Sequence, residues 1–248
     1  MSDLPNEKMP LRFHLEELRT RLIRSLVAVG AAMGGSYYFR EELMAIITRP
    51  LVFVMPKGSH LIFTGLPEAF LNYLKISLFS ALVISAPFIL YQLWKFISPG
   101  LYASEKKYVV PFVLSSTILF SGGVLFAYFL VLPPAFGFFM EFSTDFLRPM
   151  LTLREYLSFA TRLLLAFGVI FEIPVVIFFL SRIGVVSART LSRQRKYAIL
   201  IIFILAAILT PTPDAFTQMM MALPMIVLYE AGILVARWGG KKARRQDQ

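Results

Sequence analysis

The chain has 248 residues, of which 57% are hydrophobic and 16% are charged, and its formal net charge is +10. This apolar excess is well above that of a soluble globular domain and indicates an integral membrane protein. The length leaves room for several membrane spans and for no separate soluble domain, so we expect one polytopic membrane domain over residues 1–248. Because the chain has no cysteine, disulfides, thiolate metal sites and cysteine nucleophiles are excluded.

The N-terminal segment, residues 1–21, is predicted to be a cytoplasmic amphipathic helix. It lacks an apolar core followed by a small-residue cleavage site, so we expect no removable signal peptide. Leucines recur at helical spacing between residues 11 and 22, while charged residues occupy other faces, which favours a helix lying at the membrane surface. The same spacing also suits a solvated helix stabilised by ion pairs one turn apart, such as Glu17 with Arg21.

Six apolar runs fill residues 22–236, and we predict that each crosses the membrane as a helix. The predicted fold class is therefore an all-α integral membrane protein. A basic cytoplasmic tail over residues 237–248 follows the last span. The fifth run is shorter than the roughly 17 residues usually needed, so we expect the bilayer to thin beside it. The predicted spans are residues 22–39, 70–96, 108–132, 156–180, 197–209 and 215–235, with a partly helical interfacial cap over 40–68 and a second outer segment over 133–155.

The lysines and arginines predict the orientation of these spans. Six spans place both termini on one side, and that side also receives most of the 25 lysines and arginines. By the positive-inside rule, both termini are then cytoplasmic. The net positive charge is explained as a topology signal, and since no nucleic-acid-binding motif accompanies it, we expect no nucleic-acid partner.

Glu172 is the main candidate for function inside the spans. It lies in an otherwise uncharged stretch, residues 163–180, where a charge costs roughly 2.5 kcal/mol or more on insertion scales. It is therefore protonated and hydrogen-bonded, exposed to a polar cavity, or in contact with a partner helix. One function that would use it is a proton- or ion-coupled small-solute transporter. The near absence of polar residues in the middle of the other spans disfavours that alternative.

Other residues favour binding over catalysis. The only histidines, His14 and His60, lie outside the spans, and no nucleophile–base pair, metal-ligand pattern or nucleotide-binding loop is present. We therefore predict a protein that is not an enzyme and has no cofactor or metal. Gly30 and Gly34 have the spacing of a helix-packing motif, which also permits a passive scaffold for other membrane helices. Glu230 could pair with Arg237 across two turns or serve as a structural acid.

Four segments together resemble the TatC family, the receptor and core subunit of the twin-arginine protein translocase. They are HLEELRTRL at residues 14–22, the stretch SAPFILYQLWKFISPGLYASEKK at 85–107, AFGVIFEIPV at 166–175 and LTPTPD at 209–214. The resemblance covers nearly the whole chain in order. It implies a concave, cupped arrangement of six spans and a proton-gradient-driven complex that exports folded proteins across the bacterial cytoplasmic (inner) membrane.

The resemblance also assigns residues and partners. It implies that Glu17 and Glu105 bind the two arginines of a signal peptide, because a planar guanidinium forms paired hydrogen bonds with a carboxylate that a lysine cannot reproduce. Glu16 is a less favoured substitute for Glu17, and Ala103 with Ser104 depart from the usual family pattern. The remaining implied positions are Arg19, Gln92 and Phe96 around the signal peptide, and Glu172, Gln218 and Asp214 toward small single-span subunits of the TatA/TatB type; Asp214 is equally explained as a helix N-cap. Membrane lipids and further copies of the chain are the other expected partners.

Overall fold

The protein is described by a computed structural model, which covers residues 11–55, 61–97, 109–141, 152–210 and 214–243. Over these ranges the chain forms helices and no β-sheet, as predicted, apart from an isolated parallel β-bridge between Ile62 and Thr152. The helices are α1 (Leu11–Tyr38), α2 (Arg40–Val54), α3 (Glu68–Ile97), α4 (Val109–Phe126), the π-helical η3 (Ala127–Val131), α5 (Leu132–Glu141), α6 (Leu153–Ile170), α7 (Ile173–Arg182), α8 (Ala188–Arg193), α9 (Arg195–Leu209) and α10 (Ala215–Ala243).

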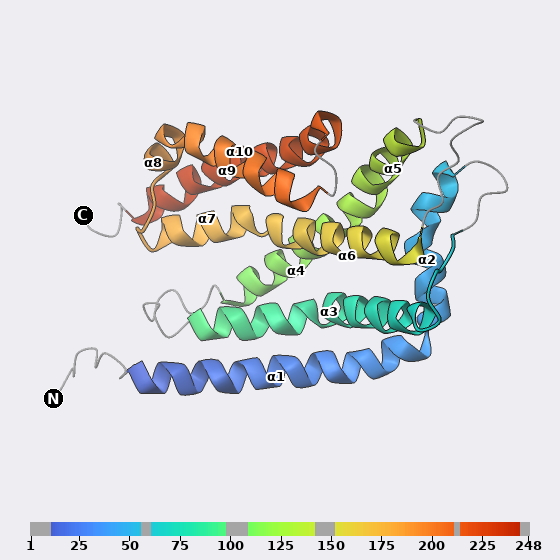
Figure 1. Ribbon diagram of the computed structural model, residues 1–248. Coiled ribbons are helices and arrows are strands. Elements are labelled where there is room, and N and C mark those ends of the chain that lie inside the picture. The colour runs from blue at the N-terminus through green and yellow to red at the C-terminus, as the bar shows by residue number, and fades with distance from the viewer. Residues whose placement is uncertain (1–10, 56–60, 98–108, 142–151, 211–213, 244–248) are drawn as a thin grey trace.

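Figure 1 shows how the long helices are arranged. α1 and α3 lie side by side along one edge, α6 and α7 continue each other in the middle, and α9 with α10 form the opposite edge. α4 crosses behind and packs on both α3 and α6, while α2 and α5 stand at the end far from the start of α1. The first helix begins and the last helix ends at the same end of the molecule (Figure 1).

Four helical stretches are long and apolar enough to cross a membrane: Glu68–Ile97, Val110–Phe138, Leu153–Arg182 and Ala215–Trp238. They coincide with the second, third, fourth and sixth predicted spans. The first and fifth predicted spans are helical too, as parts of α1 and α9, but they do not meet the same requirement of length and hydropathy. α9 has 15 residues, which corresponds to about 22 Å of helix against a hydrocarbon core of about 30 Å. Thinning of the bilayer beside α9 therefore stays a prediction.

Two element boundaries differ from the sequence-based prediction. The amphipathic segment and the first predicted span form one unbroken helix, α1, instead of a surface helix followed by a span. The third span was expected to end at residue 132, but the helix continues through α5 to Glu141. The π-helical turn η3, in which the N–H of Leu132 bonds to the carbonyl of Ala127, precedes Pro133 and Pro134. This wider turn lets the chain pass two residues that have no N–H to donate, so the helix is not ended by them.

A turn interrupts the fourth span close to its middle. The N–H of Glu172 bonds to the carbonyl of Val169 at 3.0 Å, and α7 begins immediately afterwards with Pro174 in its first turn. Proline is favoured there because the first N–H groups of a helix have no intrahelical acceptor. The sequence IFEIPV thus produces a break in the helix that places the Glu172 carboxyl between α6 and α7.

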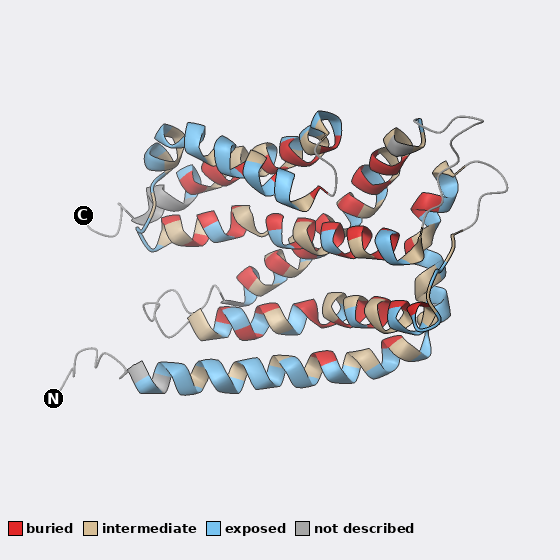
Figure 2. Cartoon of the chain, viewed as in Figure 1, coloured by how far each residue is buried: buried red, intermediate tan, exposed pale blue. Residues whose placement is uncertain are grey.

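α6 lies at the centre of the main hydrophobic core, as its burial in Figure 2 shows. Its Tyr156 is almost fully buried and donates its hydroxyl to the carbonyl of Ile47 on α2. Tyr128 on η3 donates to the carbonyl of Ile46 at 2.7 Å. Pro50 lies four residues after Ile46 and has no N–H, so the carbonyl of Ile46 lacks its normal helical donor. The two tyrosine hydroxyls therefore connect α2 to α6 and to η3 by hydrogen bonds.

Glycines permit the close packing of α4 against α6. A Cβ at Gly123 would lie 2.4 Å from the carbonyl oxygen of Phe167, so the α4 backbone contacts the α6 backbone directly. A Cβ at Gly168 would lie 2.7 Å from the ring of Phe120. Such direct backbone contact is typical of helices packed inside a membrane, where small residues at the interface take the place of large apolar ones.

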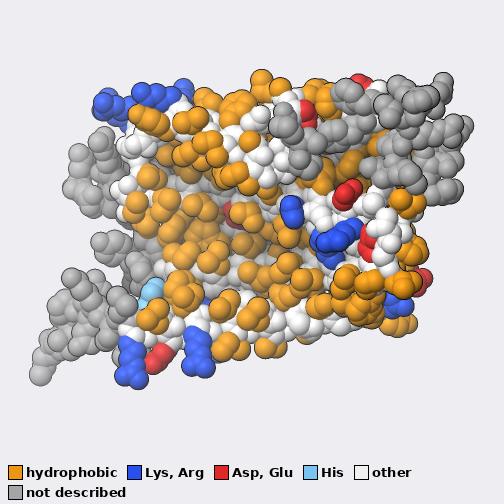
Figure 3. Space-filling model, in the orientation of Figure 1, with side chains coloured by type: hydrophobic (Ala, Val, Ile, Leu, Met, Phe, Trp, Pro, Cys, Tyr) orange, Lys and Arg blue, Asp and Glu red, His pale blue; other side chains and the backbone are white. Residues whose placement is uncertain are grey.

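The outer surface of the molecule is strongly hydrophobic, as Figure 3 shows for one face. On α1 the exposed side chains include Leu22, Leu26 and Val27, the last with 66% of its surface exposed. Gly30 and Gly34 of the same helix have nothing within 4 Å of an added Cβ, so the predicted packing motif is open in the single chain. Apolar exposure of this extent is expected for helices that contact lipid or other membrane helices.

Candidate functional site

The first candidate site joins α1 to the end of α3. The guanidinium of Arg21 donates to Oε1 of Glu17 through Nε, at 3.0 Å, and through Nη2, and it donates to Oε1 of Gln92 through Nη1 at 3.3 Å. Gln92 is buried, and the Glu17 side chain keeps 23% of its surface exposed. The structure thus brings together two of the residues that the resemblance assigns to the signal peptide, Glu17 and Gln92, although they lie far apart in the sequence.

Aromatic contacts extend this cluster by one helical turn. The ring of His14 stacks on Phe96 with 4.3 Å between ring centroids and 24° between the planes. Phe96 is therefore held against α1, one helical turn from Glu17; its role at a signal-peptide site stays a prediction. Arg19 is exposed and forms no ion pair within the described residues. Glu105, the second expected carboxylate, lies outside the described residues.

Glu16 differs from Glu17 in its surroundings. Its carboxylate pairs with Arg12 at 3.4 Å, and both side chains are strongly exposed, at 61% and 89% of their surfaces. An exposed pair of this kind contributes little, typically below 1 kcal/mol. Of the two carboxylates, only that of Glu17 lies at the contact with α3. The ranking of Glu17 above Glu16 as an arginine ligand stays a prediction.

The second candidate site is the apolar hollow around Glu172. The hollow has a volume of about 530 Å³ and is otherwise lined by uncharged apolar side chains of α3, α4, α6 and α7. Within the described part of the chain, Oε1 of Glu172 is buried and has no hydrogen-bond partner. The Ser116 hydroxyl lies within interaction range of the carboxyl, and its oxygen accepts a hydrogen bond from the Trp94 indole at 2.9 Å. A carboxyl with this spare capacity in an apolar hollow is suited to contact an incoming polar group.

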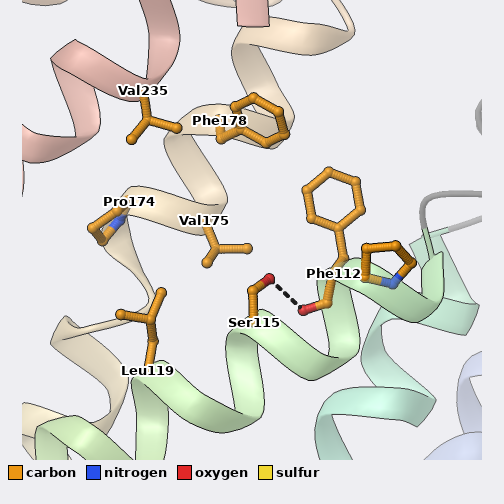
Figure 4. Close-up of a pocket in the computed structure, with 8 residues that line it drawn as sticks. Phe112, Ser115, Leu119, Pro174, Val175, Phe178 and Val235 are labelled. Carbon is orange, nitrogen blue, oxygen red and sulfur yellow. Dashed lines mark hydrogen bonds between the residues drawn. The ribbon is translucent and has the colours of Figure 1, made fainter. Parts of the chain in front are cut away.

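A further pocket lies between α4, α7 and α10 and is shown in Figure 4. It has a volume of about 360 Å³, and its walls are mainly Phe112, Leu119, Val175 and Phe178. The hydroxyl of Ser115, which also lines the pocket, donates a hydrogen bond to the carbonyl of Phe112 on the same helix at 3.0 Å (Figure 4). No ionisable side chain lines this pocket, so it offers space for apolar groups only.

Asp214 and Gln218 have roles within the α9–α10 hairpin. Oδ1 of Asp214 accepts a hydrogen bond from the N–H of Thr217 at 2.7 Å, which is the N-cap interaction that the sequence allows. Gln218 donates its amide to the carbonyl of Phe203 on α9 at 3.0 Å. These bonds fix the short hairpin, and contact with partner subunits stays a prediction for both residues.

Glu230 pairs with a different arginine from the one that the sequence suggests. It accepts a hydrogen bond from Arg195 on α9 at 2.7 Å, and no ion pair with Arg237 forms among the described residues. Because α9 and α10 are antiparallel neighbours, Arg195 lies opposite Glu230, whereas spacing along one helix can only suggest partners on that helix.

Sequence reasoning missed two supporting contacts. It identified Arg21 as the helical neighbour of Glu17, but not its second bond to Gln92. It also missed the pairing of Trp94 with Ser116 next to the Glu172 hollow. Both contacts join residues of different helices, and no local pattern in the sequence indicates them.

The fold and these sites define a multi-pass helical membrane protein that presents one polar cluster where α1 meets the end of α3 and one acid within an apolar hollow. Comparison with known proteins makes the assignment more specific. Residues 13–224 match the family model for the Sec-independent protein translocase protein (TatC). A protein of that name from Desulforapulum autotrophicum is 50% identical over 98% of this chain and 89% of its own length. The one from Escherichia coli strain K12 is 38% identical over 98% of this chain and 93% of its own.

A solved structure agrees with the sequence comparison. The crystal structure of the twin-arginine translocase receptor TatC matches with a TM-score of 0.81 and 39% identity, over 91% of this chain and 99% of that one. The chain belongs to the TatC family of protein translocase components.

Proposed function

We propose that the protein is the twin-arginine signal-peptide receptor and core subunit of a translocase that exports folded proteins, driven by the transmembrane proton gradient. The observation that carries this proposal is the cluster of Glu17, Gln92 and Phe96, assembled from two helices in a chain that belongs to the TatC family. The location is the bacterial cytoplasmic membrane. Six spans form a concave face with both termini in the cytoplasm, in keeping with α1 beginning and α10 ending at one end of the molecule (Figure 1).

Recognition of arginine follows from the geometry at Glu17. Arg21 already shows that a guanidinium can engage the Glu17 carboxylate through two nitrogens while also reaching Gln92. A signal-peptide arginine binds in the same manner by displacing Arg21, or it binds the Oε2 side of the Glu17 carboxylate. A lysine ammonium cannot form this planar, two-point contact, so the site selects arginine. Glu105 supplies the carboxylate for the second arginine, with Arg19 and Phe96 at the edge of the site.

Glu172 and its hollow receive the membrane helices of partner subunits. The hollow is lined by α3, α6 and α7 with apolar side chains, which suits a hydrophobic helix of a small single-span subunit of the TatA/TatB type. The buried Oε1 of Glu172 accepts a hydrogen bond from a polar group on that helix. Gln218 and Asp214, at the start of α10, are a second contact for such subunits, and copies of the chain associate in the complex.

Binding of signal peptides tests the proposal. The purified protein is titrated with a labelled peptide that has two arginines and with its two-lysine version. We expect tighter binding of the arginine peptide, and loss of that preference in Glu17→Gln and in Glu105→Gln. Glu16→Gln is the matched control, because it removes the neighbouring exposed carboxylate and leaves Glu17 intact. Equal binding of both peptides, unchanged by Glu17→Gln, contradicts the receptor function and returns the transporter alternative with Glu172.

A further inference from the structure

A basic cluster lies where α3 faces α6, inside the spans and away from the signal-peptide site. Arg154, Ser158 and Arg162 are four residues apart along α6, which places them on one face of that helix. Lys75 of α3 donates to Oγ of Ser158 at 2.6 Å, and Arg154 and Arg162 lie close enough to repel its ammonium group. Figure 3 shows basic side chains on the right half of the largely hydrophobic face, with acidic side chains beside them; other basic side chains lie at the opposite end.

These cations have no acidic partner in the described part of the chain. None of the ion pairs formed there includes Lys75, Arg154 or Arg162. Glu68, the acid at this end of α3, is buried, and both of its carboxylate oxygens accept hydrogen bonds. Oε2 accepts from the N–H of Thr64 at 2.8 Å and from its hydroxyl at 3.2 Å. Oε1 accepts from the backbone N–H of Arg154 at 3.3 Å. Adjacent positive charges within an apolar span are unfavourable without a counter-ion, so an added anion is strongly attracted.

The basic cluster leads directly into the apolar hollow. Leu82 follows Lys75 by seven residues on α3, and Leu165 and Val169 follow Arg162 by three and seven residues on α6. These spacings keep each set on one helix face. All three aliphatic residues line the hollow of about 530 Å³. The two helix faces therefore carry cations at one end and part of the lining of the apolar hollow beyond them.

We propose that Lys75, Arg154 and Arg162 bind the phosphate of an anionic phospholipid, with an acyl chain lying in the hollow while no partner helix occupies it. Three cations match the several acceptor oxygens of a phosphate, and arginine binds phosphate through paired N–H groups. The Ser158 hydroxyl, which donates to the carbonyl of Arg154 at 2.6 Å and accepts from Lys75, holds the lysine in place. Lys75 lies about 10 Å along α3 from its start, a depth from which a long side chain reaches the headgroup layer. The aliphatic walls favour a lipid over free phosphate.

Native mass spectrometry of the delipidated full-length protein in detergent tests this site. Phosphatidylglycerol and phosphatidylcholine with identical acyl chains are added separately. We expect one phosphatidylglycerol to bind about tenfold or more tightly than phosphatidylcholine, because each cation near an anionic lipid adds to the attraction. The double variant Lys75→Gln/Arg162→Gln loses this preference. The variant Lys75→Arg/Arg162→Lys keeps the charges and keeps the preference.

Controls separate this site from general attraction of a basic protein for anionic lipid. Arg189→Gln/Arg193→Gln removes two exposed positive charges from α8 and leaves the preference intact. An equal loss in this control, or no preference in the unaltered protein, overturns the proposal. Complete competition by millimolar inorganic phosphate shows a phosphate site without a lipid chain and overturns the lipid assignment. Unchanged lipid binding in the Gln variant, together with lost binding of an acidic single-span peptide, assigns the cluster to a protein partner instead. Matching thermal unfolding curves show that each variant is folded.

Discussion

Replacing Gly123 by alanine tests the close contact between α4 and α6. The added Cβ would lie 2.4 Å from the carbonyl oxygen of Phe167 and 2.9 Å from the Cβ of Phe171. An ordinary carbon–oxygen contact is about 3.3 Å or longer, so the two backbones must separate by roughly 1 Å. Neither the Phe167 carbonyl nor the Phe171 Cβ is the end of a flexible side chain. Overpacking of this kind costs about 1–3 kcal/mol, and the better helix propensity of alanine, about 1 kcal/mol, offsets only part of that cost.

Gly122 is the matched control on the same helix. An added Cβ at Gly122 meets nothing within 4 Å, so Gly122→Ala brings the gain in helix propensity without a clash. We expect Gly123→Ala to lower the midpoint of thermal unfolding in detergent, followed by tryptophan fluorescence, and Gly122→Ala to leave it unchanged or raise it. Because Phe171 precedes Glu172, the displacement also moves the turn between α6 and α7. Equal midpoints for the two variants would falsify the backbone contact.

Three further predictions concern single side chains. Arg21→Gln removes the guanidinium that occupies the Glu17 carboxylate. The affinity for a twin-arginine peptide, measured by titration, therefore rises by about two- to fivefold, which is the energy scale of a partly exposed ion pair. Loss of peptide binding would instead show that Arg21 belongs to the receptor surface. Tyr128→Phe leaves the Ile46 carbonyl without this donor and lowers the free energy of unfolding by about 0.5–1.5 kcal/mol, because the bond is exposed; an unchanged denaturation midpoint contradicts this. Glu172→Leu removes a carboxyl whose buried Oε1 has no hydrogen-bond partner in the described part of the chain. We expect the free energy of unfolding to rise by about 1–3 kcal/mol and export of a twin-arginine reporter to fall; full export would refute the partner contact.

Much of the helical organisation is predictable from composition and local pattern. Runs of apolar residues must form helices inside a membrane, because no water is present there to satisfy backbone groups. The second, fourth and sixth predicted spans therefore match observed helical stretches closely. The N-cap at Asp214 and the helical Glu17–Arg21 pair follow from spacing along one chain segment. The continuation of the third helix past Pro133 was not predictable, since it depends on the π-helical turn before it.

The sequence by itself thus determined the protein class, most of the spans and the candidate residue Glu172, because burial in lipid and helical spacing act over a few residues. Glu17 became a candidate through the family resemblance of its segment. Only the tertiary structure decided which of these residues meet. It placed Gln92 and Phe96 against α1, paired Glu230 with Arg195, and gathered Lys75 with two arginines of α6. These contacts depend on how close the helices approach and how they are rotated about their axes. Between α4 and α6, the contact of Gly123 with the Phe167 carbonyl sets the distance of approach.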